Sequence, residues 1–273
     1  MTNLPHITNK QQNILRLLYR FRYLDRIQIQ AFLGHQDKRR SSRWLKDLKE
    51  KQYIDWIYDP IDFTSKTKPA IYYLSINGIR YLRDQGIYPS EELRKRYRES
   101  SRRPDFIARC LLVADCCQDL EAKSASRTRY TFVTAADYMD PANDYYFLAE
   151  LQPHLCFVKR SPKTKTGYLL EIFDITTPRY MVKKRLNDYV QHLSSSDWES
   201  ETGDSEPPTV LIVCPTKPNL IYAKRRTRQL LALTGLVDYE EDIEDEAKAV
   251  HIRFATTEQV KRQGVTAMIW EEA

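Results

Sequence analysis

One run of side chains in this sequence has the types and the spacing to bind an anionic polymer. It spans residues 38–51, where cations recur with the helical period of about 100° per residue. A helix here would place Ser41, Trp44, Leu45 and Leu48 on one face, and Arg39, Arg43, Lys46 and Glu50 on the opposite face. Lysine and arginine on an exposed helix face bind the phosphates of nucleic acid. The run therefore predicts a DNA-binding helix, and the alternative is a solvated charged face without a ligand.

The elements around this run predict a winged helix-turn-helix. They are, in order, helices at residues 8–23, 24–33 and 38–51, with a break at 34–37, and then strands at 53–58 and 71–75. A polar segment that contains Lys66 and Lys68 separates the two strands. In a helix-turn-helix, the second helix of the motif lies in the major groove. The run at 38–51 is in that position.

This interpretation predicts which side chains contact DNA. Arg39 and Arg43 are candidates for the edges of guanine bases, which arginine binds with two hydrogen bonds. The lysines are candidates for phosphates, which position a protein without reading the sequence. The complete predicted set is Arg39, Arg40, Ser42, Arg43, Lys46, Lys66 and Lys68.

The distribution of charge agrees with a DNA-binding front half. The chain has 273 residues and a formal net charge of +6, from 43 lysines and arginines and 37 acids. Residues 1–103 contain 22 of the cations and 11 of the acids, whereas residues 104–273 contain 21 cations and 26 acids. A basic front half joined to an acidic rear half indicates that the front contacts nucleic acid.

Composition also excludes several classes of protein. A chain that is 42% hydrophobic and 29% charged is typical of soluble globular proteins. It has no apolar stretch long enough to span a bilayer, and residues 1–10 lack the apolar region of a secretion signal. The five cysteines include no C-x-x-C pair, so we expect free thiols rather than zinc ligands or disulfides. We expect a cytoplasmic protein that does not contact membranes.

The rear half predicts an α/β domain with a mixed sheet. Its predicted elements are a helix at 106–120, strands at 129–134, 145–150, 155–159 and 168–175, a helix at 178–193, a strand at 209–214, a helix at 218–233, a strand at 250–254, a helix at 257–263 and a strand at 267–270. The predicted division of the chain is a winged helix-turn-helix domain at 1–86, a basic linker helix at 87–103 and an α/β domain at 104–273. The linker is either a solvated connector or a further contact to the DNA backbone.

Several stretches resemble the replication-relaxation family of plasmids and integrative elements. They are IYYLSING at 71–78, FIARCLLVAD at 106–115, LQPH at 151–154, LLEIFDITT at 169–177 and KRLNDY at 184–189. The resemblance implies that the protein binds double-stranded DNA during the replication or mobilisation of a mobile element. It also implies a restriction-endonuclease-like fold for the rear domain. A second copy of the chain and replication or relaxase proteins are further candidate partners.

A nuclease of that fold needs acids that hold Mg²⁺ and a lysine near the attacking water. The usual pattern is Pro-Asp on one strand and Asp/Glu-x-Lys on the next. Here His154 stands in the Asp position and Phe173 in the Lys position, so that Glu171 alone fits. Asp174 lies past the position of the acid, and a lysine would have to come from the following helix.

We therefore expect a rear domain without catalytic activity, cofactor or resident metal. The sequence has no glycine-rich phosphate loop, H-E-x-x-H pair or Ser/His/Asp motif that would indicate another reaction. Two alternatives stay open. One is a nuclease that uses Glu171 with Asp174, Lys183, Lys184 and Mg²⁺. The other is a transcriptional regulator whose rear domain dimerises or binds an effector.

Overall fold

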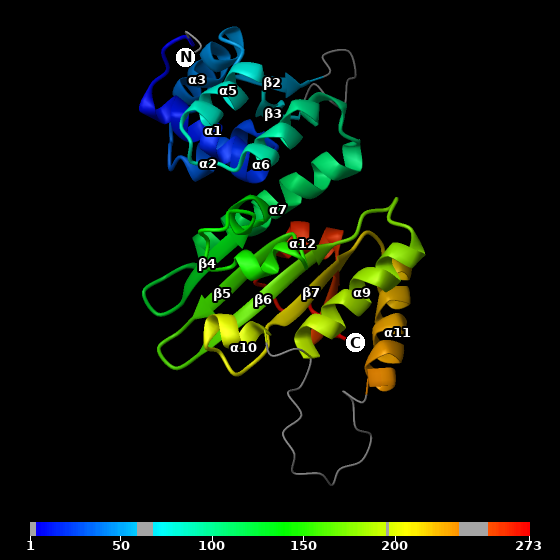
Figure 1. Cartoon of the computed structure of the whole chain (residues 1–273). Coiled ribbons are helices and arrows are strands. Elements are labelled where there is room, and N and C mark those ends of the chain that lie inside the picture. Colours follow the sequence, from blue (N-terminus) through cyan, green and yellow to red (C-terminus); the bar gives the residue numbers. More distant parts are fainter. Residues whose placement is uncertain (1–3, 59–67, 195–196, 235–250) are drawn as a thin grey trace. The chain divides into compact units, whose positions relative to one another are not determined.

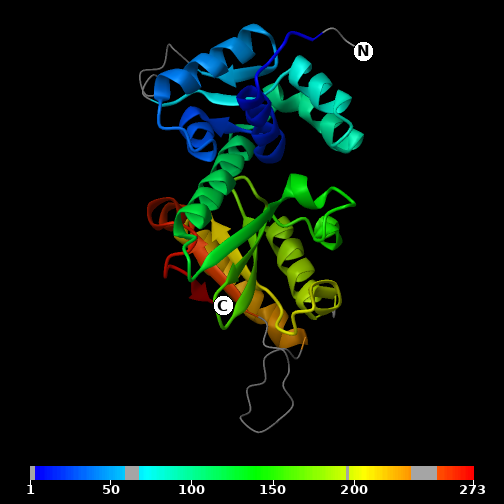
Figure 2. The same cartoon turned by 90° about the vertical axis from the view of Figure 1, so that its left-hand side faces the viewer.

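The computed structural model describes residues 4–58, 68–194, 197–234 and 251–273, and it is mixed α/β as predicted (Figure 1). The chain forms two compact units, residues 1–118 and residues 119–273. The front unit contains helices and a small sheet, and the rear unit contains a six-stranded sheet with helices (Figures 1 and 2). Within the described ranges, no helix combines the length and the apolar character needed to cross a membrane.

The front unit has the order of elements that was predicted for a winged helix-turn-helix. They are α1 (Asn9–Phe21), β1 (Leu24–Asp25), α2 (Arg26–Phe32), α3 (Lys38–Glu50), β2 (Ile54–Ile57), β3 (Ile71–Leu74), α5 (Ile76–Asp84), α6 (Ser90–Lys95), the 3-10 helix η1 (Arg96–Ser101) and α7 (Pro104–Lys123). Strand β3 pairs antiparallel with both β1 and β2. Leu15 and Leu18 of α1 and Leu45 and Leu48 of α3 are buried in the core of this unit.

A side-chain cap determines where α2 begins. Asp25 accepts a hydrogen bond from the backbone of Gln28, whose side chain accepts one from the backbone of Asp25. Leu24 and Asp25 also pair with β3 as strand β1. The helix therefore begins at Arg26, two residues later than predicted.

Residues 87–103 belong to the front unit and are not a solvated connector. They contain α6 and η1, and the side chains of Arg96 and Glu99 are buried there. Arg22 donates from Nε to Oε1 of Glu99 at 2.9 Å, and Arg96 donates to the carbonyl oxygen of Tyr19 at 3.2 Å. Each partner lies 77 residues earlier in the chain. Such distant partners explain why a local reading of this charged segment predicted a connector.

The boundary between the two units lies inside α7, later than the predicted boundary after residue 103. Ile107 of α7 packs in a cluster with Tyr23 and Tyr73 of the front unit. Gln28 of α2 donates from Nε2 to the carboxylate of Asp115 at 2.6 Å. The first part of α7 thus completes the core of the front unit.

The rear unit is built on a mixed sheet with the order β4-β5-β6-β7-β8-β9. After the end of α7, its elements are β4 (Arg129–Thr134), α8 (Ala135–Tyr138), the 3-10 helix η2 (Tyr146–Ala149), β5 (Leu155–Arg160), β6 (Lys165–Ile172), α9 (Arg179–Ser194), α10 (Asp197–Thr202), β7 (Thr209–Cys214), α11 (Lys217–Thr234), β8 (Ile252–Thr256), α12 (Thr257–Gln263) and β9 (Glu271–Glu272). Strands β6, β7 and β8 are parallel, and the other pairs are antiparallel. The predicted mixed sheet is therefore confirmed.

Helices α9 and α11 lie side by side on one face of this sheet (Figures 1 and 2). Their inward side chains share one hydrophobic core with the strands, including Val182, Leu186, Leu220, Ala223, Leu169, Val210 and Ile252. Every residue of β7 is buried, as expected for a central parallel strand that is covered on both faces.

Two of the predicted strands are wrong because local turns satisfy their backbone groups. Residues 145–150 contain the 3-10 helix η2, and the Asn143 side chain accepts a hydrogen bond from the backbone of Tyr145 at 2.9 Å. Residues 267–270 form a turn in which Ile269 donates to the carbonyl oxygen of Ala267 at 2.9 Å. The last strand is β9, which pairs with β8.

Candidate nucleic-acid interface

Helix α3 presents the predicted DNA-binding side chains to solvent. Its inward face is apolar: Leu45 and Leu48 are buried, and Ser41 beside them donates from its hydroxyl to the carbonyl oxygen of Asp37 at 3.3 Å. Its outward face is exposed at each predicted position of the helix, namely Arg39, Arg40, Ser42, Arg43 and Lys46. The helical period therefore placed these side chains on the correct side, while their contact with DNA stays a prediction.

The cations of α3 are available for an external anion. In the part of the chain that the structure describes, Arg39, Arg40 and Arg43 make no ion pair. Lys46 lies 3.8 Å from Glu50, but both side chains are exposed, and such pairs contribute little to stability. Asp37 begins the helix, and hydrogen bonds from the backbone of Arg39 and Arg40 lower the pKa of its carboxyl. That carboxylate caps the helix through the backbone, and among the described residues the three guanidinium groups make no ion pair.

Strand β2 and the residue that follows it contribute aromatic side chains that were not predicted as part of the site. Trp56 and Tyr58 are exposed beside β3, with their ring centroids 6.0 Å apart. Lys49 of α3 lies 4.8 Å from the centroid of the Trp56 ring and 2.8 Å from the Asp55 carboxylate. The spacing of Trp56 and Tyr58 by two residues, which puts two aromatic side chains on the same side of an extended chain, is the signal that could have identified them. Of the two predicted wing lysines, Lys68 is exposed and Lys66 lies outside the described residues.

Glu171 of β6 is held by α9. Its side chain is 5% exposed, and Arg185 donates to both carboxylate oxygens, from Nη2 to Oε2 at 2.6 Å and from Nε to Oε1 at 3.3 Å. The Tyr189 hydroxyl donates to Oε2 at 2.7 Å. Arg185 also donates from Nη1 to the carbonyl oxygen of Leu151 at 2.6 Å. Glu171 and Arg185 therefore form a buried ion pair, and this pair links strand β6 to helix α9.

His154 lies against the same carboxylate. Its Nδ1 atom accepts a hydrogen bond from the backbone N–H of Ile172 at 3.1 Å and lies 3.5 Å from Oε2 of Glu171. Burial of Glu171 opposes its ionisation, but the neighbouring His154 and Arg185 favour the carboxylate and lower its pKa to about 2. Burial and the adjacent Glu171 carboxylate raise the pKa of Tyr189. Glu171 is thus a permanent anion with its counterion in place.

The other predicted catalytic residues do not join Glu171. The Asp174 carboxylate accepts hydrogen bonds from the hydroxyls of Thr176 and Thr177 at 2.8 and 3.0 Å, in the turn before α9. Lys183 and Lys184 are exposed on α9, and neither is an ion-pair partner of Glu171. All five cysteines are free thiols, and the described ranges contain no cluster of three metal-binding side chains.

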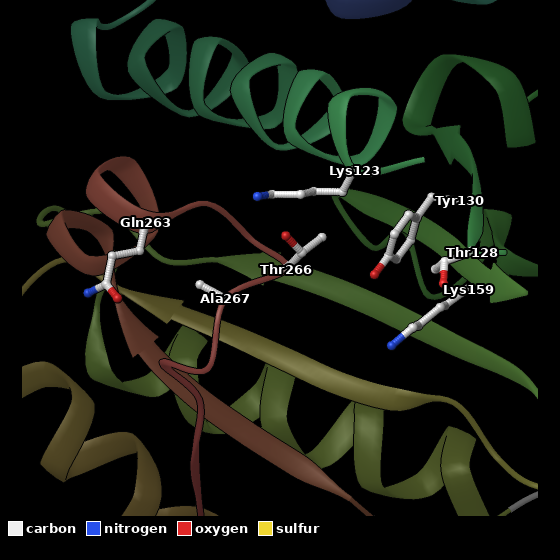
Figure 3. A pocket seen from close by; sticks show the side chains of 7 residues that line it. All are labelled: Lys123, Thr128, Tyr130, Lys159, Gln263, Thr266 and Ala267. Atoms are coloured by element: carbon white, nitrogen blue, oxygen red, sulfur yellow. The ribbon is translucent and has the colours of Figure 1, made fainter. Parts of the chain in front are cut away.

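A hollow of about 350 Å³ lies on the face of the rear sheet that is opposite to α9 (Figure 3). The residues that line it are Lys123, Thr128, Tyr130, Lys159, Gln263, Thr266 and Ala267. Thr266 is already engaged, because its N–H and hydroxyl both donate to Asp119, at 3.0 and 2.9 Å. The hollow includes none of the predicted site residues, and two surface lysines do not by themselves select a ligand.

Comparison with known proteins gives a family and one distant structural likeness. A family model described as replication-relaxation matches residues 15–204, well over half of the chain. No curated protein matches. One similar solved structure is that of the restriction endonuclease FokI bound to DNA, with 12% identity and a TM-score of 0.28 over 94% of this chain and 45% of that one. A likeness at this TM-score carries no inference about fold or activity.

Proposed function

The chain belongs to the replication-relaxation family, and from this premise we propose that it binds duplex DNA through α3 and the wing of its front unit. The role would lie in the replication or mobilisation of a plasmid or other mobile element, in the cytoplasm. The observation that carries the proposal is the exposed face of α3, where three arginines lie without ion-pair partners in the described part of the chain. A second copy of the chain and replication or relaxase proteins are proposed as further partners.

The side chains of α3 are proposed to contact different parts of the DNA, according to their chemistry. Arg39 and Arg43 lie four residues apart, so they share a helix face and can reach neighbouring bases. Arg40, Ser42, Lys46 and Lys68 are proposed to contact phosphates and sugars. Trp56, on the neighbouring strand, adds an apolar surface for the sugar–phosphate backbone.

Charge reversal on α3 tests the proposal. The probe is a duplex that contains the binding site, identified by footprinting on DNA of the mobile element that encodes the protein. We expect Arg39→Glu/Arg43→Glu to weaken binding to this footprinted site by at least tenfold, because a guanine contact is worth about 1–3 kcal/mol. Fluorescence anisotropy at moderate salt measures the affinity. The control is Lys261→Glu/Arg262→Glu at the exposed end of α12, which changes the net charge equally. Unchanged affinity in the α3 variant would remove the proposal.

We also propose that the rear unit does not cut DNA. Metal-dependent hydrolysis requires an acid that is free to hold Mg²⁺. Both oxygens of Glu171 accept hydrogen bonds from Arg185, and among the described residues no lysine pairs with the carboxylate. Arg185 thus neutralises the charge that a metal would otherwise neutralise.

A plasmid assay tests the proposal that the rear unit does not cut DNA. Supercoiled DNA incubated with the protein and Mg²⁺ or Mn²⁺ is expected to stay supercoiled on an agarose gel. Glu171→Gln, which keeps the shape of the side chain but removes its charge, is expected to behave in the same way. Nicking by the wild type that disappears in Glu171→Gln, and persists in Lys261→Glu/Arg262→Glu, would establish the nuclease alternative.

A further inference from the structure

Helices α9 and α11 form one continuous surface of the rear unit. They lie side by side over the sheet (Figures 1 and 2), and their inward residues share a single core. At the start of both helices, the Tyr222 hydroxyl donates to the carbonyl oxygen of Arg179 at 3.5 Å. The Arg179 guanidinium lies 5.1 Å from the centroid of the Tyr222 ring. The outward faces of the two helices are therefore neighbours.

Positive charge is concentrated on these two helices. Residues 104–273 contain 21 lysines and arginines and 26 acids, so the rear half is acidic as a whole. Helices α9 and α11 carry nine of those cations and a single acid, Asp188. The remainder of the rear half therefore has 12 cations and 25 acids. A local excess of this size inside an acidic domain creates a positive surface potential.

Some of the nine cations have structural partners. Arg185 pairs with Glu171, while Lys217 and Lys224 lie 2.5 and 3.3 Å from Glu271 of β9. The remaining outward cations include Lys183 and Lys184 of α9 and Arg225 and Arg228 of α11. These four side chains are exposed, and in the described ranges none of them makes an ion pair. They are free to neutralise an external anion.

The apolar residues on this surface accompany the cations. Tyr180 is 70% exposed and lies one helical turn before Lys184, and Ile221 is 58% exposed and lies one turn before Arg225. A protein–protein interface would have an apolar centre depleted of lysine. Here cations occupy several outward positions of both helices, together with the exposed apolar side chains of Tyr180, Ile221 and Leu233. This composition fits a sugar–phosphate backbone better than a protein partner.

We propose that the outward faces of α9 and α11 form a second DNA-binding surface, which contacts the phosphate backbone of duplex DNA without reading its sequence. The surface goes beyond the role proposed for α3, because it belongs to the other unit and needs no specific site. A lysine ammonium is a point charge that binds phosphate in any sequence context. The second surface would hold DNA that flanks the site bound by α3, or a separate duplex.

Neutralisation of the four free cations in the full-length chain tests the proposal. The variant is Lys183→Gln/Lys184→Gln/Arg225→Gln/Arg228→Gln, and the probe is a random-sequence duplex titrated across a range of salt concentrations. Each phosphate contact contributes about 0.9 to the slope of log K against log salt, so we expect the slope to become less steep by about 3 to 4. The affinity at low salt is expected to fall roughly tenfold or more.

A matched variant, Arg127→Gln/Lys163→Gln/Lys261→Gln/Arg262→Gln, removes four exposed cations elsewhere in the rear unit. Its slope is expected to stay close to that of the wild type. Circular dichroism checks folding; if the fourfold α9/α11 variant does not fold, the pairs Lys183→Gln/Lys184→Gln and Arg225→Gln/Arg228→Gln are each expected to lower the slope by about 2. An unchanged slope, or an equal loss in the matched variant, overturns the proposal.

The experiments test the two DNA-binding proposals independently of each other. Arg39→Glu/Arg43→Glu is expected to lose preference for the footprinted site while it still binds random duplex through α9 and α11. If only the α9/α11 variant loses affinity, the role of α3 is wrong and the second surface stands. If only the α3 variant loses affinity, the second surface is wrong, and an acidic protein becomes the better partner for its charge.

Discussion

Arg185→Leu is expected to lower the free energy of unfolding of the rear unit by about 3–5 kcal/mol, because it leaves a buried carboxylate without its counterion. Glu171 is almost completely buried, and Arg185 donates hydrogen bonds to both of its carboxylate oxygens. The same substitution removes the donor to the carbonyl oxygen of Leu151. Urea unfolding followed by tryptophan fluorescence measures the loss.

The double variant Glu171→Leu/Arg185→Leu separates the cost of an unpaired charge from the value of the pair. Replacing a whole buried ion pair by apolar residues is often close to neutral. We therefore expect the double variant to recover most of the stability that Arg185→Leu loses, which a double-mutant cycle expresses as a coupling energy. Equal stability of Arg185→Leu and the wild type would show that Glu171 is not a buried anion.

The free energy of unfolding measured at acidic pH gives a second test of the same ion pair. The pKa of Glu171 is lowered from 4.5 to about 2 in the folded protein, so the unfolded chain binds this proton more readily. The stabilisation is therefore fully present above about pH 4.5, and it is lost as the pH falls towards 2. Glu171→Gln is expected to lack this part of the pH dependence while it keeps the remainder.

Glu99→Ala is expected to lower the free energy of unfolding of the front unit by a similar amount, about 3–5 kcal/mol. The Glu99 side chain is 1% exposed, and Arg22 donates to it from Nε at 2.9 Å. Arg102 lies 3.8 Å from its other carboxylate oxygen. Removal of the carboxylate leaves Arg22 without its buried partner. Because η1 then loses its ion pair with the residue at the end of α1, and keeps the hydrogen bonds of Arg96 and of the Glu99 backbone, the front unit loses part of its support.

A neighbouring acid provides the control for Glu99. Glu91 lies in α6 and is exposed, so Glu91→Ala is expected to change the stability by no more than about 0.5 kcal/mol. Urea unfolding of both variants makes the comparison, and DNA binding by folded Glu99→Ala is expected to stay intact at low temperature. A small effect of Glu99→Ala would return residues 87–103 to the role of a solvated connector.

The sequence was sufficient wherever a local period decided the structure. On α3, Leu45 and Leu48 are inward and Arg39 and Arg43 are outward, because a helix turns by a fixed angle at each residue. Strands β4 and β7 have the predicted bounds, since a run of β-branched or apolar residues between turns is itself a local signal. The order of helices and strands along the front unit follows from such signals.

The contacts of Glu171 could not be obtained in the same way. The sequence pointed to Lys183 or Lys184 as its neighbour, but Arg185 is the residue that reaches it. Successive residues on a helix differ in direction by about 100°, so the register of α9 against β6 decides which cation faces the carboxylate. That register is set by the packing of Leu186 and Tyr189 into the sheet.

The buried charges of residues 87–103 show the same limit. A segment rich in arginine and glutamate is normally exposed, because burial of an unpaired ion is unfavourable. Glu99 is buried because Arg22, 77 residues away, pairs with it. Local sequence patterns determined most of the helices and strands and the basic face of α3. Tertiary structure alone decided which charges are neutralised inside it and which stay free for a ligand, because ion pairing depends on distances between segments that are remote in sequence.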